Sequence, residues 1–400
     1  MNNLDYVIVG GGLSGDAAVK GIRELDPNGS IAMFSTEPDP PYKRPELSKG
    51  LWLGKAEAKI WRKTADRAVD LHLSDRIAAI DAANKTVTDE HGESYTYNKL
   101  LLATGCFPIK LPFGGDRIVY YRDFQDYLKL RRQTEEGERF LVIGGGFIGS
   151  EIASSLRSIG KTVSLVFPEE TIGARLYPAE LAGFLNEYYR EHGVDVLAGD
   201  AVASIKDLGE TFKVTLRSGK TLDVDGIVAG IGVRPDTELA EKAGLKIDNG
   251  IVVDNQMVTS HPDIFAAGDV ANFYHAQLKK RVRVEHEDHA VQSGKLAGRN
   301  MAGANLAYTH IPAFYSDLFE LGYEAVGELN GELETIADWQ EPFKKGVVYY
   351  LADNRVRGVL LWHIWDAVPA ARSILEDADR LNKSDLNLAL LTGRMEKDKK

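Results

Sequence analysis

The chain has 400 residues, of which 44% are hydrophobic and 27% charged, so it can bury a core in two or three domains of about 100–200 residues each. Its 48 lysines and arginines against 59 aspartates and glutamates give a net charge of -11, which argues against nucleic acid as a partner. The single cysteine, Cys106, excludes a disulfide, a dithiol redox pair and a thiolate zinc site. Any redox chemistry therefore requires a bound cofactor.

The N-terminus enters an apolar strand at Leu4 without a charged leader, and no stretch approaches the ~18 apolar residues of a membrane span. We therefore expect no signal or transit peptide, no membrane span, and a reduced, cytoplasmic location.

The first 25 residues predict a buried parallel strand, a glycine turn and a helix. The strand covers 4–9 (LDYVIV), the turn 10–15 (GGGLSG) and the helical spacing 17–25. The same pattern returns as a strand at 140–143, a turn at 144–149 (GGGFIG) and a helix that ends at Gly160. Glycine lets the backbone approach a pyrophosphate, and a helix N-terminus offers free N–H groups to it. Two such units predict two dinucleotide sites.

An acidic residue follows the second strand of each unit. Glu37 comes after the strand at 30–36, and Glu169 after the strand at 162–167. A carboxylate at this place accepts hydrogen bonds from the ribose hydroxyls and repels a 2′-phosphate. The next basic residue after Glu169 is Arg175. NADH is therefore favoured over NADPH, although either carboxylate could be an ordinary solvated loop residue.

Further along the chain, alternation and the turn at 217–220 predict an antiparallel ribbon over 211–235, and helical periodicity predicts a helix over 178–191. From about Ala307 the pattern changes to aromatics and short strands, with a helix after Pro369, which predicts a third, smaller domain. The tail at 395–400 (MEKDKK) is typical of a solvated charge run.

Together these motifs resemble the two-dinucleotide flavoprotein reductases of the pyridine nucleotide-disulfide oxidoreductase superfamily. That group holds ferredoxin, putidaredoxin and rubredoxin reductases, and the nearest likeness is to its apoptosis-inducing-factor branch. The resemblance covers nearly the whole chain and also rests on motifs at 40–52 (PPYKRPELSKGLW), 103–105 (ATG), 230–236 (GIGVRPD), 264–271 (IFAAGDVA), 283–303 and 315–327.

The resemblance implies an α/β, glutathione-reductase-like fold with two Rossmann-like domains and a smaller C-terminal α+β domain. The expected boundaries are 1–112 and 236–305 for FAD binding, 113–235 for NAD binding and 306–400 for the C-terminal domain. The residues implied for FAD are Gly10, Gly12, Leu13, Ser14, Gly15, Glu37, Arg44, Lys49, Thr104, Gly105, Gly268, Asp269, Glu285, His286 and Tyr315. The residues implied for NAD are Gly144, Gly146, Phe147, Ile148, Gly149, Glu169 and Gly232.

Three residues are implied as catalytic: Lys49 and Glu151 as an ion pair beside the flavin N5, and Phe147 as an aromatic gate where the nicotinamide stacks. The plainer alternatives are a surface lysine, a first-turn glutamate and a core phenylalanine. Asp269 could likewise be a helix cap without a ligand. Tyr315 stands where relatives carry tryptophan. No metal is expected, because the neighbouring acids and histidines at 285–289 point to different faces of a helix start.

The function implied is an FAD-dependent NADH oxidoreductase without a redox-active disulfide, which passes electrons to an iron–sulfur or rubredoxin-type protein or a quinone. The alternative is a redox-sensing protein, similar to apoptosis-inducing factor, with a long-lived reduced FAD–NAD complex and NADH-linked dimerisation. NADH is the expected small-molecule partner, and a homodimer is possible in either case.

Overall fold

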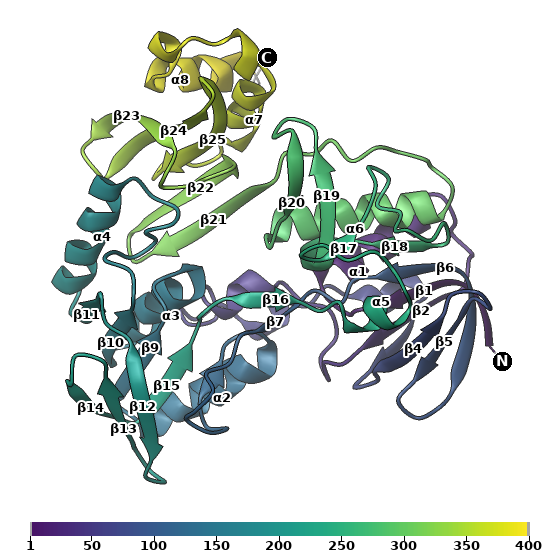
Figure 1. Ribbon diagram of the computed structural model, residues 1–400, viewed down its shortest axis with the longest axis horizontal. Coiled ribbons are helices and arrows are strands. Elements are labelled where there is room, and N and C mark those ends of the chain that lie inside the picture. The colour runs from purple at the N-terminus through teal and green to yellow at the C-terminus, as the bar shows by residue number, and fades with distance from the viewer. Residues whose placement is uncertain (1, 398–400) are drawn as a thin grey trace. The chain divides into compact units, whose positions relative to one another are not determined.

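The computed structural model describes residues 2–397 and divides them into two compact units (Figure 1). The first unit contains the residues up to Pro45, Ala56–Phe107 and Arg234–Pro312. The second contains Glu46–Lys55, Pro108–Val233 and the residues from Ala313 onward. Of the predicted charged tail, residues up to Lys397 belong to the last helix, α8 (Leu388–Lys397), and 398–400 lie outside the described residues.

A mainly parallel sheet forms the core of the first unit. Its order is β3-β2-β1-β6-β5-β4, with β18 paired to β6. The strands are β1 (Asn2–Val9), β2 (Ile31–Ser35), β3 (Asp70–Leu73), β4 (Ile77–Asp81), β5 (Thr86–Asp89), β6 (Ser94–Leu102) and β18 (Ile264–Ala266). β1 pairs in parallel with both β2 and β6, which brings the strand predicted at 4–9 to the middle of the sheet.

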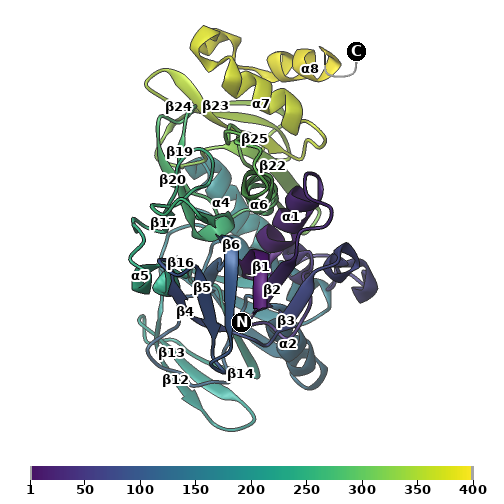
Figure 2. The ribbon, with the colours of Figure 1, turned by 90° about the vertical axis from the view of Figure 1, so that its right-hand side faces the viewer.

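Helices α1 (Leu13–Arg23) and α6 (Glu287–Met301) pack side by side in the first unit, as Figure 2 shows. Glycines make this close approach possible. A Cβ on Gly298 would lie 2.1 Å from the carbonyl oxygen of Ala18, and a Cβ on Gly21 would lie 2.1 Å from that of Lys295. α1 follows the first glycine turn directly, so this packing fixes the helix whose N-terminus faces the expected dinucleotide.

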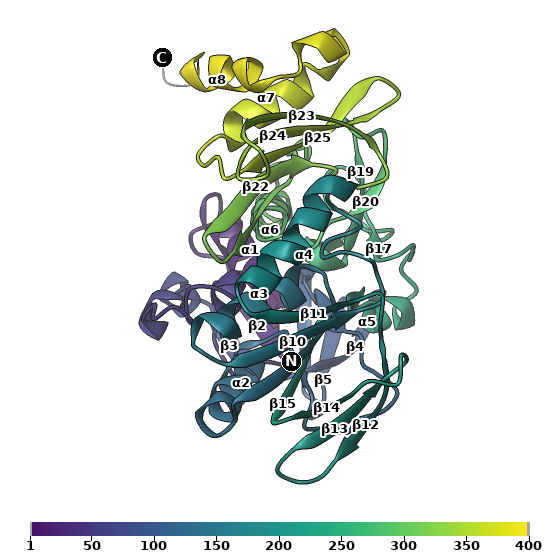
Figure 3. The ribbon, with the colours of Figure 1, turned by 90° about the vertical axis from the view of Figure 1, so that its left-hand side faces the viewer.

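A five-stranded parallel sheet forms one layer of the second unit, in the order β11-β10-β9-β15-β8. Its strands are β8 (Val119–Tyr120), β9 (Arg139–Ile143), β10 (Thr162–Phe167), β11 (Val194–Ala198) and β15 (Gly226–Ala229). The helices of this region are α2 (Phe124–Glu136), α3 (Phe147–Ser158) and α4 (Ala179–Glu191). Figure 3 shows α3 and α4 beside strands β10 and β11, and α3 also packs on β9. The helix predicted over 178–191 is confirmed as α4.

The predicted antiparallel ribbon is right only in part. β12 (Val202–Asp207), β13 (Phe212–Leu216) and β14 (Thr221–Val224) form an antiparallel sheet, with the predicted turn at 217–220 between the last two. β15, which follows at 226–229, instead pairs in parallel with β9. All four of its residues are buried, and a continuous apolar run of this kind belongs inside a parallel sheet.

The C-terminal part of the second unit is an antiparallel sheet with helices, in the order β21-β22-β25-β24-β23. Its strands are β21 (Ala313–Leu318), β22 (Leu321–Gly327), β23 (Glu334–Glu341), β24 (Lys345–Ala352) and β25 (Arg355–Trp362). Helix α7 (Val368–Glu376) packs on β22 and β25, and it begins next to Pro369 as predicted.

The remaining strands lie mostly in the first unit. Strands β17 (Ile251–Val252), β19 (Ala271–His275) and β20 (Lys280–Arg283) form a small sheet. The short helix α5 (Glu238–Lys242) precedes β17 in the sequence. Strands β7 (Cys106–Pro108) and β16 (Val233–Pro235) form a two-stranded sheet. Among the described residues, no helix has the length and apolar character that a membrane crossing requires.

Candidate active site

The first glycine turn lies where distant segments of the first unit converge. Gly10 has φ +121°, and a Cβ there would lie 2.1 Å from the carbonyl oxygen of Ala103, in the ATG segment. A Cβ on Gly268 would lie 2.1 Å from the Oγ of Ser14, within the turn itself. The structure therefore brings the predicted FAD residues at 10–15, 104–105 and 268–269 to one place.

The end of α1 that faces this place is suited to an anion. Its N-cap residue, Gly12, makes no side-chain capping bond, and a Cβ placed on it would meet no atom within 4 Å. The first N–H groups of a helix without a cap are available to a ligand, and the helix dipole favours negative charge there. Residues Leu13 to Gly15 are buried in the first turn of the helix. The chain here fits a pyrophosphate.

Glu37 and Arg44, which are both among the residues predicted to bind FAD, form an ion pair with each other. Arg44 Nη2 is 2.6 Å from Glu37 Oε1, and the hydroxyl of Tyr42 donates to the other carboxylate oxygen at 2.6 Å. The Arg44 guanidinium also interacts electrostatically with Asp269. The two predicted residues are therefore close in space, and their separate roles stay predictions.

Asp269 is in a 3-10 turn (Gly268–Val270) of the first unit. Its carbonyl oxygen accepts a hydrogen bond from Arg283 Nη1 at 3.1 Å and lies 3.7 Å from the sulfur of Cys106, which is buried. Arg283 also pairs with Glu285 at 2.6 Å. Asp269 interacts electrostatically with His286, at the N-cap of α6, and burial lowers the pKa of this histidine to about 4. His286 is therefore neutral at pH 7.

Thr104 and Gly105 hold the segment that follows β6. Thr104 Oγ1 donates to the carbonyl oxygen of Asp236 at 2.7 Å. The N–H of Asp236 in turn donates to the carbonyl oxygen of Gly105 at 2.9 Å. Both predicted residues thus contribute to the frame of the first site.

The second glycine turn repeats the construction of the first. Gly144 has φ +113°, and a Cβ there would lie 2.4 Å from the carbonyl oxygen of Gly230. Gly146 is the N-cap of α3 and makes no side-chain capping bond, and a Cβ on it would meet nothing within 4 Å. Gly149 permits contact with the turn, because its Cβ would lie 1.7 Å from the carbonyl oxygen of Gly144. The second unit therefore also fits a pyrophosphate.

The other residues predicted for NAD lie in the same unit. Ile148 is exposed in the first turn of α3, and the carbonyl oxygen of Gly232 accepts a hydrogen bond from the N–H of Ile109 at 2.9 Å. Glu169 follows β10, and its carboxylate is 3.1 Å from Arg175 Nη2. Arg175 is six positions away in sequence, and the fold brings its positive charge to Glu169, the carboxylate predicted to bind the ribose.

Lys49, Glu151, Phe147 and Tyr315 all belong to the second unit. Glu151 is on α3 with only 4% of its surface exposed, and it forms an ion pair with Lys49 Nζ. The Lys49 ammonium also lies over the ring of Tyr315, 5.1 Å from its centroid. The ion pair predicted from the resemblance is present, so the alternative of a free surface lysine is wrong.

Phe147 begins α3 and contacts Phe314 edge to face, with 5.6 Å between ring centroids. It precedes Glu151 by one helical turn, so the two side chains share a face of α3. Its role as a gate stays a prediction.

Two serines at the ion pair were not predicted. Ser48 Oγ donates to Glu151 Oε2 at 2.5 Å, and Ser316 Oγ donates to Glu151 Oε1 at 2.6 Å. Both lie inside motifs that carried the resemblance, but a serine in sequence gives no sign of which buried acceptor it will meet.

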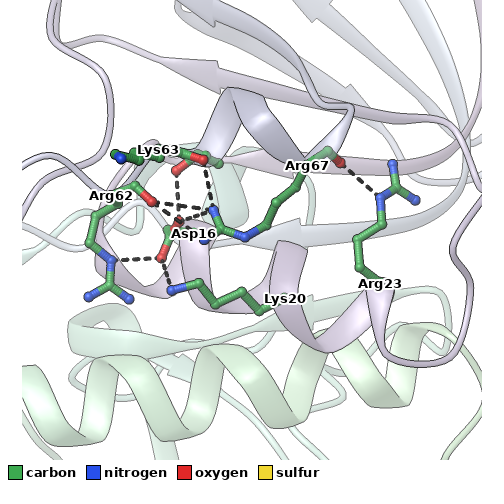
Figure 4. A network of polar contacts seen from close by, with 7 residues as sticks. Asp16, Lys20, Arg23, Arg62, Lys63 and Arg67 are labelled. Carbon is green, nitrogen blue, oxygen red and sulfur yellow. Dashed lines mark hydrogen bonds and ion pairs between the residues drawn. The ribbon is translucent and has the colours of Figure 1, made fainter.

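Asp16 was also missed. It lies on α1 directly after the first glycine turn, is completely buried, and is surrounded by cations (Figure 4). Its carboxylate forms ion pairs with Lys20 at 3.0 Å, with Arg62 at 2.8 Å and with Arg67 at 3.2 Å. The hydroxyl of Thr64 donates to it at 2.7 Å. Asp16 thereby fastens the segment 62–67 to the helix of the first dinucleotide turn. An acid between the glycine turn at 10–15 and the apolar helical pattern at 17–25 was the available signal.

Comparison with known families supports this architecture. The family described as pyridine nucleotide-disulphide oxidoreductase matches residues 4–294. The family described as the C-terminal part of mitochondrion-associated apoptosis-inducing factor matches 297–342 and 337–377.

Individual relatives span most of the chain. It is 32% identical to apoptosis-inducing factor 1 of Dictyostelium discoideum, over 96% of this chain and 80% of that protein. It is 34% identical to monodehydroascorbate reductase 3 of Arabidopsis thaliana, over 89% of this chain and 88% of that protein.

Among solved structures, a ferredoxin reductase from Rhodopseudomonas palustris superposes with a TM-score of 0.89 at 26% identity, covering 97% of this chain and 99% of that one. Putidaredoxin reductase, in its covalent complex with putidaredoxin, superposes with a TM-score of 0.88 at 28% identity, covering 99% and 100%. The predicted fold class, two dinucleotide-binding domains and a C-terminal domain, is confirmed.

Proposed function

The chain belongs to the pyridine nucleotide-disulphide oxidoreductase family, and we propose that it oxidises NADH through bound FAD and passes the electrons to a separate acceptor. Members of this family use FAD and NAD(P)H. One observation carries the proposal: two glycine turns of matching geometry stand in a chain with a single cysteine. With no second cysteine to form a redox-active disulfide, electrons must leave the flavin for another molecule.

The chain's own residues divide the work. FAD, when bound, accepts a hydride and can release electrons one at a time. The N-terminus of α1 and Asp269 would hold it, and the N-terminus of α3 with Glu169 would hold NADH. The Lys49 ammonium would stabilise negative charge on the reduced ring, and Glu151 would hold that ammonium in place. Phe147 would cover the place of the nicotinamide.

The preference for NADH rests on Glu169, because a carboxylate at the ribose repels a 2′-phosphate. Arg175 beside it offers a compensating positive charge, so the preference is expected to be moderate.

The acceptor is proposed to be a small iron–sulfur or rubredoxin-type protein or a quinone. The relatives named ferredoxin reductase and putidaredoxin reductase support a protein acceptor. Those named monodehydroascorbate reductase add monodehydroascorbate to the acceptors to be tested. Each NADH supplies two electrons, so it would reduce two molecules of a one-electron acceptor.

The test is an anaerobic titration of the purified flavoprotein with NADH and, separately, with NADPH, followed by each acceptor class in turn. Bleaching of the flavin spectrum by NADH and rapid reoxidation by one acceptor class are expected. A protein that purifies without flavin, or a flavin that neither nucleotide bleaches, would overturn the proposal. Lys49→Ala is the matched variant, and it should keep its flavin but be reduced more slowly.

A second function is supported by the match of the C-terminal region to apoptosis-inducing factor. In this alternative NADH converts the protein to a long-lived reduced form that dimerises and is read by a partner. A long-wavelength absorbance that persists in air, together with a larger particle by light scattering, would favour it. Rapid turnover with any one carrier would exclude it.

A further inference from the structure

The Glu151 carboxylate is held by three donors that come from two separate segments of the second unit, 46–55 and strand β21. Lys49 Nζ and Ser316 Oγ bond to Oε1, and Ser48 Oγ bonds to Oε2. Ser48 is fixed in turn, because its carbonyl oxygen accepts a hydrogen bond from Ser155 Oγ at 2.7 Å. With Glu151 and Ser155 both on α3, the helix grips the segment 46–55 at two points.

Strand β21 runs along α3, and residues at successive positions of the strand contact residues at successive turns of the helix. Phe314 contacts Phe147, Ser316 bonds to Glu151, and the N–H of Phe319, just after the strand, donates to Ser154 Oγ at 3.0 Å. Two residues of strand advance about 6.7 Å and one turn of helix about 5.4 Å, so such contacts can recur along both elements. Ser316 therefore occupies the place on β21 that faces Glu151.

The two hydroxyls remove a freedom that a glutamate otherwise has. The last torsion of a glutamate side chain is broad, so a carboxylate held only by a flexible lysine can rotate and carry the ammonium with it. Here each oxygen has its own hydroxyl donor, and rotation would break both bonds at a place where Glu151 and the two serines are all buried. The position at which Lys49 can bind Oε1 is thereby fixed.

We propose that Ser316 and Ser48 are positioning residues, which lock the Glu151 carboxylate and through it fix the Lys49 ammonium where the flavin is reduced. The inference rests on the proposed function for its consequence, whereas the lock itself is a property of this chain alone. Neither serine needs to touch a nucleotide for this role.

The test compares Ser316→Ala and Ser48→Ala with Ser154→Ala, all in the full-length flavoprotein. Ser154 is a matched control, because it is a buried serine on α3 whose hydroxyl accepts a hydrogen bond from the N–H of Phe319, whereas the donors to the Glu151 carboxylate are Lys49, Ser48 and Ser316. Two readouts are used. One is the rate of flavin reduction at saturating NADH together with the NADH concentration of half-saturation. The other is the rate at which an amine-acylating reagent labels Lys49, followed by peptide mass spectrometry.

Ser316→Ala and Ser48→Ala are expected to slow flavin reduction about tenfold, the size typical of one hydrogen bond to a charged group, with unchanged half-saturation. Lys49 should be labelled faster in both variants, because a mobile carboxylate holds the ammonium less tightly. Ser316→Thr keeps the hydroxyl and should stay within about twofold of the parent. Ser154→Ala should leave both readouts unchanged.

The inference is overturned if the parent flavin is reduced by NADH while Ser316→Ala and Ser48→Ala match Ser154→Ala in both readouts. If NADH does not reduce the parent flavin, the proposed function fails and the labelling of Lys49 alone decides about the lock. Should Ser316→Ala not fold, Ser48→Ala, which frees the other carboxylate oxygen, supplies the same decision.

Discussion

Glu169 carries the choice between the two nicotinamide nucleotides at the scale of a single residue. Glu169→Lys is expected to weaken NADH binding about tenfold or more, because the hydrogen bonds to the ribose hydroxyls are lost, and to leave the flavin content unchanged. Titration of flavin reduction with each nucleotide measures this. Glu187→Lys makes the same charge change on the exposed side of α4 and is the control. Equal NADH affinity in both variants would make Glu169 an ordinary loop residue.

Asp16 is the buried anion that links helix α1 to the segment 62–67 through its ion pairs. Asp16→Asn keeps the shape of the side chain but leaves Lys20, Arg62 and Arg67 without their shared anion. We expect the free energy of unfolding to fall by about 3 kcal/mol at neutral pH, because removal of one partner leaves uncompensated charge. Urea unfolding measures the difference. Glu238→Gln removes the acid of an exposed pair with Lys242 and should lower the free energy of unfolding far less than Asp16→Asn does.

The pH dependence of this effect has a definite sign. Burial by itself raises the pKa of Asp16, but the hydrogen bond from Thr64 and the charge of Arg62 outweigh it, and the net pKa is lowered. Such a carboxyl adds stability above its unfolded pKa of about 3.9 and loses that contribution as the pH falls through its folded pKa. The gap in unfolding free energy between parent and Asp16→Asn should therefore shrink below about pH 4. A gap that does not change with acidification would contradict the lowered pKa.

Among the contacts between elements, the one between α1 and α6 depends on glycines, because any larger residue would keep the two helices apart. Gly298→Ala would place a Cβ 2.1 Å from the backbone oxygen of Ala18, so the helices must separate. We expect a loss of about 2 kcal/mol or more of unfolding free energy, measured in urea. Gly183→Ala, in the interior of α4 where a Cβ meets nothing within 4 Å, should instead stabilise by about 0.5–1 kcal/mol. The same sign for both variants would contradict the packing argument.

Element prediction from the sequence succeeded where the signal is local. The two strand–turn–helix units, α4 and the start of α7 were predicted because periodicity and turn residues act over a few positions. β15 was misassigned to the ribbon, since a strand's partner is chosen by its burial in the whole sheet. A run of four apolar residues after a hairpin does not reveal which sheet it enters.

At the scale of the whole molecule, the net charge of -11 predicts how salt changes the choice of acceptor. Turnover with an anionic acceptor such as ferricyanide should rise with ionic strength, because salt screens its repulsion from the protein. Turnover with a cationic acceptor such as cytochrome c should fall. A neutral quinone is the control and should change little. The opposite order would show that a local basic patch governs docking. The cytoplasmic location and the possible homodimer stay predictions.

The two dinucleotide units could be predicted from the sequence because glycine spacing is written in short contiguous segments. The order of the motifs pointed to the family, and the Lys49–Glu151 pair was implied by that resemblance alone. The residues that surround that pair became apparent from the folded structure and not from the motifs. The hydroxyls of Ser48 and Ser316 reach Glu151 from 103 and 165 positions away in the chain. Arg175 likewise reaches Glu169, and three cations and Thr64 enclose Asp16. The cause is the same in each case. A buried polar group must have a hydrogen-bonding or charged partner, but nothing in the sequence around that group indicates which residue the fold will bring to it.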